Sequence, residues 1–228
     1  CYRHFEKVEK LKPLGIKPLS LIFIDRVANY MDPDGMIKVL FVEEFPKAYR
    51  DFYKEDPPAS FVHEVQTYYF AKTNAGEFTD NENSMAKQRE IYDEILRDKE
   101  ALLAFDNPRQ FIFSHSALGV GWDNPNVFNI ATLNQTYSDV KKRQEIGRGL
   151  RICRNQSGHR IYDGDDTPEG EEINLLTVIP NESYQTFVTQ YQSELHHHVP
   201  TRHSPKGKKP AKKKVKLDRE RFESDPFQ

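Results

Sequence analysis

Short, nearly continuous apolar runs alternate along the chain with longer stretches in which apolar residues recur at helical spacing. The apolar runs predict buried strands at 19–25, 110–114, 127–133 and 173–179. The helical spacing predicts helices at 88–103, 137–150 and 183–195, and a short one within residues 1–18. Strands that alternate with helices are typical of an α/β domain with a mainly parallel sheet flanked by helices.

The segment from 31 to 87 is the least regular part of this pattern. Residues 37–42 predict a strand, 43–53 a short amphipathic helix, and 63–70 a half-exposed strand with period-two alternation. A plain connection between parallel strands does not need roughly 55 residues. We therefore expect an insertion into the sheet domain after its first strand.

The chain changes character near residue 196. Between Val199 and Leu217 there are eight basic residues and no acidic ones, whereas the whole chain has a formal net charge of −2. The rest of the chain is therefore acidic, unlike a protein that coats nucleic acid non-specifically. We expect residues 1–195 to form one domain, and residues 196–228 to form a basic flexible linker and the start of a following domain.

Composition narrows the class of protein. Hydrophobic residues make up 37% of the chain, enough for a globular core. No apolar run approaches the ~20 residues of a membrane span, so we expect no membrane contact. The two cysteines, Cys1 and Cys153, give no disulfide framework, which predicts a reduced, cytoplasmic protein. Because the sequence begins at Cys1 rather than at Met, we expect a fragment of a longer protein.

The strongest chemical signal is the octet from Gln144 to Arg151, Gln-Glu-Ile-Gly-Arg-Gly-Leu-Arg. Offsets of four and three would place Gln144, Arg148 and Arg151 on one face of a helix. Two ionised guanidiniums held close together favour an anion between them, such as a nucleotide phosphate. Glycines at 147 and 149 cost about 1 kcal/mol each in a helix, and we interpret them as close approaches of backbone to a ligand. A solvated Arg-rich helix is the other interpretation.

A second block precedes the octet, where the strand at 110–114 ends. From Ser114 to Val127 it reads Ser-His-Ser-Ala-Leu-Gly-Val-Gly-Trp-Asp-Asn-Pro-Asn-Val. In this order and at this spacing, the two blocks resemble motifs V and VI of superfamily 2 helicases. Their wording is similar to that of the Res subunit of type III restriction enzymes. The resemblance covers about residues 1–195, and it implies the second RecA-like domain of such a protein.

The resemblance implies roles for particular residues. Arg151 would act as an arginine finger and Arg148 would contact the γ-phosphate, which makes these two the catalytic candidates. The residues implied to bind ATP are Gly121, Asp123, Gln144 and Gly147. Those implied to contact DNA are His115, Ser116 and Asp25, although Asp25 also suits a plain core strand with a charged exit. Three adjacent histidines at 196–198 point apart on a helix, so no metal site is assigned.

The same resemblance implies cofactors and partners. ATP and Mg²⁺ would be held mainly by an absent first domain, since these residues contain no phosphate loop and no acidic metal motif. The implied partners are double-stranded DNA, the Mod methyltransferase subunit and the first RecA-like domain of the same polypeptide. We expect the isolated chain to be inactive. Gly119-Val120 stands where the type III pattern usually has Arg-Glu, which leaves the coupling of the motor uncertain.

Two other functions stay open at this point. One is a superfamily 2 helicase with another role, in repair or on RNA. The other is a non-catalytic α/β interaction module with a basic tail, for which Arg148 would be dispensable to ATPase activity.

Overall fold

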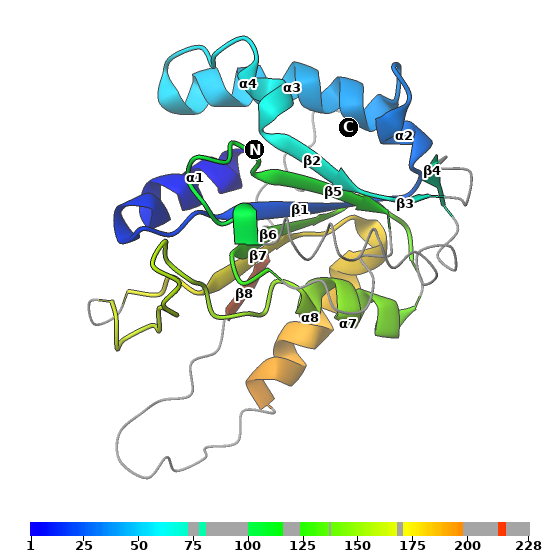
Figure 1. Cartoon of the computed structure of the whole chain (residues 1–228). Coiled ribbons are helices and arrows are strands. Elements are labelled where there is room, and N and C mark those ends of the chain that lie inside the picture. Colours follow the sequence, from blue (N-terminus) through cyan, green and yellow to red (C-terminus); the bar gives the residue numbers. More distant parts are fainter. Residues whose placement is uncertain are drawn as a thin grey trace.

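Six parallel strands form the main sheet of the computed structural model (Figure 1). The structure describes residues 1–72, 78–80, 100–115, 124–136, 138–167, 171–197 and 214–217. The sheet order is β2-β5-β1-β6-β7-β8. The strands are β1 (Leu19–Ile24), β2 (Gln66–Tyr69), β5 (Phe111–His115), β6 (Val127–Thr132), β7 (Leu175–Ile179) and β8 (Lys214–Leu217). A separate antiparallel pair consists of β3 (Ala71–Lys72) and β4 (Phe78–Thr79).

Helices cover both faces of the sheet, as Figure 1 shows. The central strand β1 supplies both cores, because its side chains alternate between the two faces. Leu19, Leu21 and Phe23 belong to one hydrophobic cluster, which includes residues of β6, β7 and α8. Ile24 belongs to the other, an aromatic-rich cluster with residues of α1 and α3. The described helices are α1 (Tyr2–Leu11), η1 (Lys12–Leu14), α2 (Ala28–Met31), α3 (Met36–Tyr53), α4 (Phe61–Glu64), α7 (Asp139–Gly147) and α8 (Glu182–His197).

The predicted α/β class, with a parallel sheet flanked by helices, is confirmed. Each of the four predicted core strands is present within a few residues of its expected bounds, as β1, β5, β6 and β7. The last two predicted helices correspond to α7 and α8, and the short helix expected within residues 1–18 corresponds to α1. Most of the helix predicted at 88–103 lies outside the described residues.

The strand predicted at 37–42 is wrong, because these residues belong to the 18-residue helix α3. The run Ile-Lys-Val-Leu-Phe-Val is apolar enough to fit either type of element. The helical period decides it, since Ile37, Phe41 and Phe45 recur every four residues and are the buried side chains of α3. A single apolar run could not show this, whereas the spacing over the whole helix does.

Two other predicted segments contribute to the main sheet. Within 31–87, read as an insertion, β2 pairs in parallel with β5 and forms one edge of the sheet. Within the predicted linker, Lys214–Leu217 form β8, which pairs in parallel with β7 at the other edge. In the sequence, lysine and apolar residues alternate over 214–217, which is the period of a strand. The flexible-linker prediction is therefore corrected for these four residues.

A buried histidine joins α1 to the sheet. His4 is only 2% exposed, and its Nδ1 and Nε2 lie 2.9 Å from Ser20 Oγ and 2.7 Å from Gln110 Oε1. Asn129 Nδ2 donates to the same Ser20 hydroxyl at 3.0 Å, so the network joins α1 to β1, to β6 and to the residue that precedes β5. Burial lowers the pKa of His4 from 6.5 to about 3. Between about pH 3 and pH 6.5, His4 is therefore neutral in the folded chain but protonated in the unfolded chain.

This pKa predicts a loss of stability in mild acid. The folded pKa lies below the unfolded value, so below pH 6.5 the unfolded state binds the extra proton and is favoured. Between pH 7 and 5 the chain should lose about 2 kcal/mol more unfolding free energy than the His4→Gln variant. Urea titrations at both pH values measure the difference. His63→Gln, at an exposed position, should keep the wild-type pH dependence; an equal loss in His4→Gln would contradict the prediction.

Candidate functional site

The octet of the sequence analysis begins on α7 but does not stay on it. Ser138 caps the helix, since its hydroxyl accepts from the backbone N–H of Lys141 at 3.3 Å. The helix ends at Gly147 and Arg148 is its C-cap. Two further tight turns follow, with Gly149 N–H donating to Ile146 O at 3.0 Å and Leu150 N–H to Gly147 O at 3.2 Å. Arg151 lies beyond them, so the prediction of a single helical face is wrong for Arg151.

The predicted phosphate-binding side chains lie outside the core. Gln144 and Arg151 are exposed and Arg148 is partly buried. At Gly147 an added Cβ would meet no atom within 4 Å, so the surface beside this glycine is open. An amide and two guanidiniums are thus present in eight consecutive residues beside an open surface, and these side chains can donate hydrogen bonds to an anion.

Gly149 has a different role from the one predicted. A Cβ there would come within 2.5 Å of Leu176 Cδ1 and 3.1 Å of Ile130 Cδ1. Both neighbours are fully buried side chains of β7 and β6. Gly149 therefore lets the turn after α7 pack directly on the sheet, and its interpretation as a close approach to a ligand is wrong.

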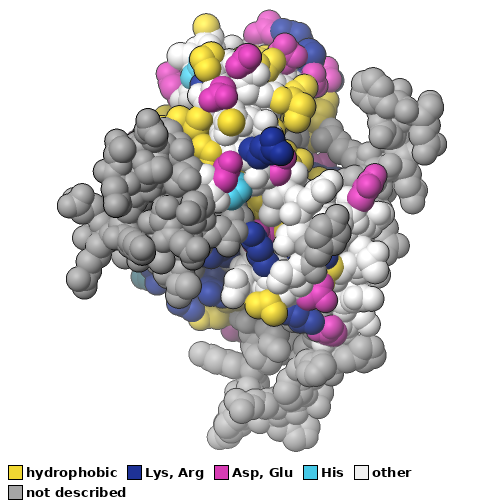
Figure 2. Space-filling view, turned by 90° about the vertical axis from the view of Figure 1, so that its right-hand side faces the viewer, with side chains coloured by type: hydrophobic (Ala, Val, Ile, Leu, Met, Phe, Trp, Pro, Cys, Tyr) yellow, Lys and Arg dark blue, Asp and Glu magenta, His cyan; other side chains and the backbone are white. Residues whose placement is uncertain are grey.

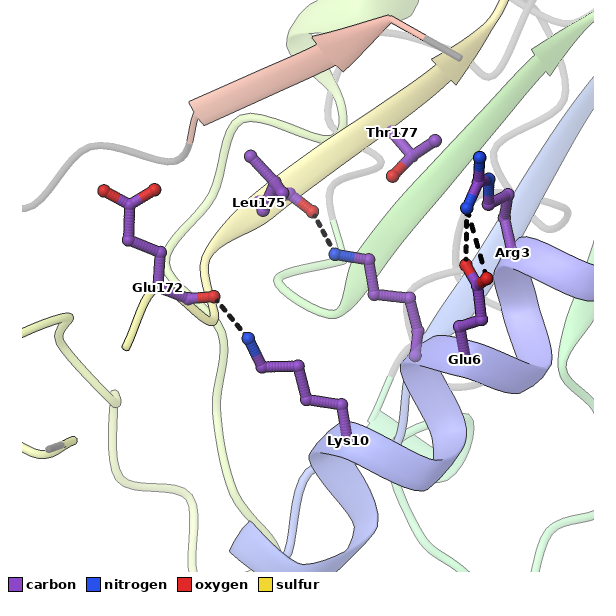
Figure 3. A pocket seen from close by; sticks show the side chains of 7 residues that line it. Arg3, Glu6, Lys10, Glu172, Leu175 and Thr177 are labelled. Atoms are coloured by element: carbon purple, nitrogen blue, oxygen red, sulfur yellow. Dashed lines mark hydrogen bonds and ion pairs between the residues drawn. The ribbon is translucent and has the colours of Figure 1, made fainter. Parts of the chain in front are cut away.

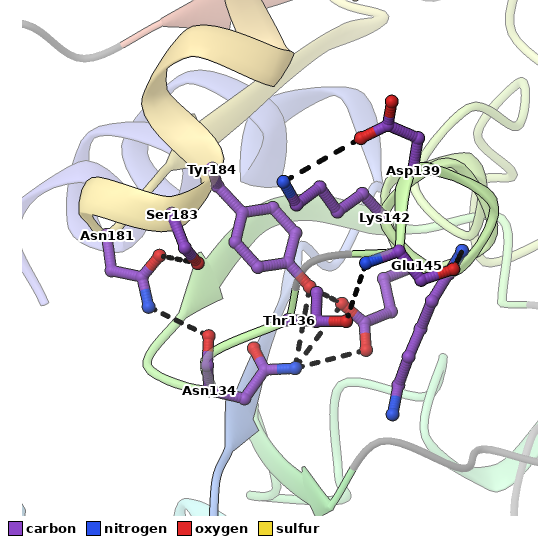
Figure 4. Close-up of polar contacts among 10 residues, drawn as sticks. Asn134, Thr136, Asp139, Lys142, Glu145, Asn181, Ser183 and Tyr184 are labelled. Atoms are coloured by element: carbon purple, nitrogen blue, oxygen red, sulfur yellow. Dashed lines mark hydrogen bonds and ion pairs between the residues drawn. The ribbon is translucent and has the colours of Figure 1, made fainter.

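A buried carboxylate that the sequence analysis missed holds α7 in place (Figure 4). Glu145 is 2% exposed and accepts hydrogen bonds from the Tyr184 hydroxyl and, at 3.2 Å, from Asn134 Nδ2. Burial raises the pKa of Glu145, and its hydrogen bonds to Tyr184 and Asn134 oppose that shift. The inward-facing residues have helical spacing, at i, i+3, i+4 and i+7: Lys142, Glu145, Ile146 and Gly149. Because two of them are charged, the sequence does not reveal this stripe as a buried face.

Cations of α7 pack on aromatic rings of α8. Lys142 Nζ lies 5.5 Å and 5.4 Å from the ring centroids of Tyr184 and Phe187. Arg143 lies over the Tyr191 ring at 4.8 Å and pairs with Glu194 at 2.6 Å on the surface. These contacts, together with Glu145, make the interface between α7 and α8 largely polar and cationic.

Two predicted DNA contacts come together at the carboxyl ends of neighbouring strands. In the pairing of β1 with β5, Ile24 is opposite His115, so Asp25 follows at the same edge. Asp25 is exposed and accepts from Asn29 Nδ2 at 2.8 Å. Asp80, which the sequence analysis did not single out, accepts from Val27 N–H at 2.7 Å and lies 3.9 Å from His115 Nε2.

Figure 2 looks at the side of the molecule toward which the arrowheads of β1, β2 and β5 point in Figure 1. Hydrophobic side chains gather in the upper part of this face, at the height of α2 and α3. Side chains of both charges lie next to one another toward its middle. The visible part of this face is therefore mixed in charge.

Several predicted site residues, namely Ser116, Gly121 and Asp123, and the Gly119-Val120 departure, lie outside the described residues. The end of their block is described and is linked to the segment that follows the octet. Asn126 Nδ2 donates to Arg154 O at 2.9 Å, and Arg154 N–H donates to Asn126 Oδ1 at 2.8 Å. This two-way amide pairing connects the start of β6 to the segment that follows Arg151.

A pocket between α1 and the start of β7 is lined by Arg3, Glu6, Lys7, Lys10, Glu172, Leu175 and Thr177 (Figure 3). Lys7 Nζ donates to Leu175 O and Lys10 Nζ to Glu172 O, each at 2.9 Å. Arg3 pairs with Glu6 at 3.0 Å. Its cations therefore bind carbonyls and a carboxylate of the chain itself, which docks α1 on β7.

The described residues contain neither a metal site nor a membrane span. No group of three or more His, Cys, Asp or Glu in this part of the chain is placed to hold a metal ion. None of the described helices combines the length and the apolar character that crossing a membrane requires.

Comparison with curated proteins shows what this chain is similar to. The chain is 41% identical over 165 residues to the Res subunit of the type III restriction-modification enzyme EcoP15I of Escherichia coli. It is 40% identical over 165 residues to the EcoPI Res subunit of Escherichia phage P1. It is 37% identical over 167 residues to the StyLTI Res subunit of Salmonella typhimurium. This chain is homologous to part of the type III Res subunits.

The homology covers most of this chain but little of its relatives. The aligned residues make up 64–67% of the chain and 16–17% of the Res subunits. No family model matches the sequence. Domain 2 of the DEAD-box helicase Mss116p bound to an RNA duplex aligns over 78% of the chain and 46% of its own, with a TM-score of 0.32 and 13% identity. A TM-score and an identity this low assign neither a fold nor a function to this chain. The resemblance to Res subunits is confirmed, whereas the roles of single residues stay predictions.

The two glycines of the octet should respond oppositely to alanine. Gly149→Ala should lower the free energy of unfolding by about 1–3 kcal/mol, because its Cβ overpacks the core at Leu176 and Ile130. Gly147→Ala should leave the unfolding free energy unchanged or raise it by up to about 1 kcal/mol, since alanine favours helix and the space is open. Denaturant titration of both variants measures this. Equal effects would show that the turn does not pack as described.

Proposed function

We propose that this chain is the second RecA-like motor domain of an ATP-dependent DNA translocase within a type III restriction endonuclease. The observation that carries the proposal is the 37–41% identity to Res subunits over 64–67% of the chain. The parallel α/β fold and the location of Arg148 and Arg151 outside the core support it.

The residues of the octet suit a triphosphate. Guanidiniums are planar, permanently charged donors that match phosphate oxygens, and the open backbone at Gly147 leaves room beside them. Bound ATP supplies the phosphoryl group for transfer, and Mg²⁺ neutralises part of its charge. Arg148 and Arg151 donate to phosphate oxygens and stabilise the charge that develops in the transition state, an effect of about 10³–10⁵ in rate for such arginines.

The surface location of these arginines makes the reaction depend on a second domain. In this proposal the first RecA-like domain holds the nucleotide, and Gln144 and Arg148 reach it only when the two domains close. Bound ATP then favours the closed arrangement of the two domains, and hydrolysis of ATP allows the domains to open. Repeated closing and opening moves the protein along double-stranded DNA.

The DNA contact is proposed at the carboxyl ends of β5 and β1. His115 and the neighbouring Ser116 are its best candidates. Asp25 suits it less well, because its side chain is a carboxylate that already accepts from Asn29. A carboxylate repels a phosphate, whereas the imidazole of His115 and the hydroxyl of Ser116 can donate to one. The Mod subunit is the proposed partner that recognises the DNA site, as the name restriction-modification enzyme of the relatives suggests.

Arginine substitutions in the intact protein test the proposal. Arg148→Ala and Arg151→Ala should each lower the kcat of DNA-stimulated ATP hydrolysis by about 10³-fold or more, through lost transition-state stabilisation. Arg143→Ala removes the same charge from the exposed side of α7 and should keep near-normal kcat. Normal kcat in Arg148→Ala would instead favour a non-catalytic interaction module.

The isolated chain should neither bind ATP tightly nor hydrolyse it, with or without DNA, because its arginines need nucleotide held by another domain. A phosphate-release assay on residues 1–228 measures this. Turnover by the purified chain that Arg151→Ala abolishes would contradict the proposal, whereas turnover that persists in that variant would indicate a contaminating ATPase.

A further inference from the structure

The contact between α7 and the rest of the domain has an unusual composition. The buried residues of this helix are Lys142, Glu145 and Ile146, of which only the last is apolar. Amphipathic helices normally dock through an apolar stripe, which holds them firmly but tolerates some rotation. Hydrogen bonds are directional, so a helix docked through them is fixed in rotation as well as in position.

The Glu145 carboxylate is the centre of these directional contacts. Its two partners come from different elements: Asn134 follows β6, and Tyr184 lies in the first turn of α8. Asn181 joins the start of α8 to the end of β6, since its Nδ2 donates to Asn134 O at 2.8 Å and its N–H to Thr132 Oγ1 at 3.2 Å. Figure 4 shows the carboxylate, the phenol and the amides converging.

The network is one turn away from Arg148 and connected to it through the backbone. The N–H of Arg148 donates to the carbonyl oxygen of Glu145 at 3.3 Å. On the other side of Arg148, Gly149 packs on Leu176 and Ile130 of the sheet. The backbone that carries Arg148 is thus held from both sides, by polar contacts before it and by close packing after it.

We propose that Glu145 is a positioning residue, whose hydrogen bonds to Tyr184 and Asn134 set the orientation in which Arg148 reaches its phosphate. This inference rests on the proposed function. A buried carboxylate is costly unless it is hydrogen-bonded, and an apolar side chain at 145 would dock the helix with less expense. The gain from keeping the carboxylate is then geometric, because misplacement of a catalytic group by about 1 Å can cost about 10²-fold in rate.

The test compares single and combined variants in the intact protein, with ATP and DNA saturating. Glu145→Gln keeps the size of the side chain but removes its charge. Tyr184→Phe keeps the ring on which Lys142 packs and removes the hydroxyl. Each should lower kcat at least about tenfold with little change in KM for ATP, because the arginine acts mainly in the transition state. The double variant should lose about as much as either single one.

One background and one control variant make the test specific. In Arg148→Ala protein, Glu145→Gln should cost no further kcat, since there is no arginine left to position. Glu194→Gln breaks an exposed pair between the same two helices and should change kcat by less than about twofold.

The possible outcomes distinguish failure of the positioning role of Glu145 from failure of the proposed function. If Glu145→Gln and Tyr184→Phe lower the melting temperature but leave kcat of the folded enzyme normal, Glu145 stabilises the fold only and the inference is overturned. An additive loss in the Arg148→Ala background also overturns it. If Arg148→Ala itself retains normal kcat, the proposed function fails, whatever the Glu145 variants do.

Discussion

The parallel pairing of β1 with β5 and β6 is the constraint on which the rest of the structure depends. Parallel strands end at the same edge of a sheet, so one central strand aligns the exits of its neighbours. Register brings Ile24 opposite His115 and Phe23 opposite Thr132. Residues that are about 90 positions apart in sequence therefore meet at one edge. The burial of β1 on both faces makes this register costly to change, because a slip of one residue would exchange its two cores.

The helix α7, on which the octet begins, is held in place by other kinds of contact than the strands of the sheet. The strands are joined by backbone ladders and apolar packing, whereas α7 is placed by a carboxylate, an amide, a phenol and cations over rings. Such contacts add only modestly to the net free energy of unfolding, but they fix the orientation of the helix. This division suits a domain in which a rigid sheet carries a segment whose direction matters more than its binding strength.

The sequence predicts the sheet better than the site. Continuous apolar runs are sufficient for β1, β5, β6 and β7, because strands buried on both faces have no polar side. The run at 37–42 fails for the same reason, since a short run that is almost all apolar has no clear period to read. In the octet, the prediction of one helical face fails at Arg151, where the chain turns after Gly147. Glu145 and Gly149 could not be interpreted without knowing what packs against them.

The strand β8 covers the outer edge of β7 and becomes the edge strand on that side of the sheet. Without residues 214–217, the outer N–H and C=O groups of β7 would be an open template for another polypeptide. Choosing the boundaries of a recombinant version is therefore a question of solubility: ending the chain after α8 would invite strand-to-strand association. Four residues from a stretch that looks dispensable in the sequence thus cover β7 with a strand in which lysine alternates with apolar residues, and lysine on an edge strand disfavours further pairing.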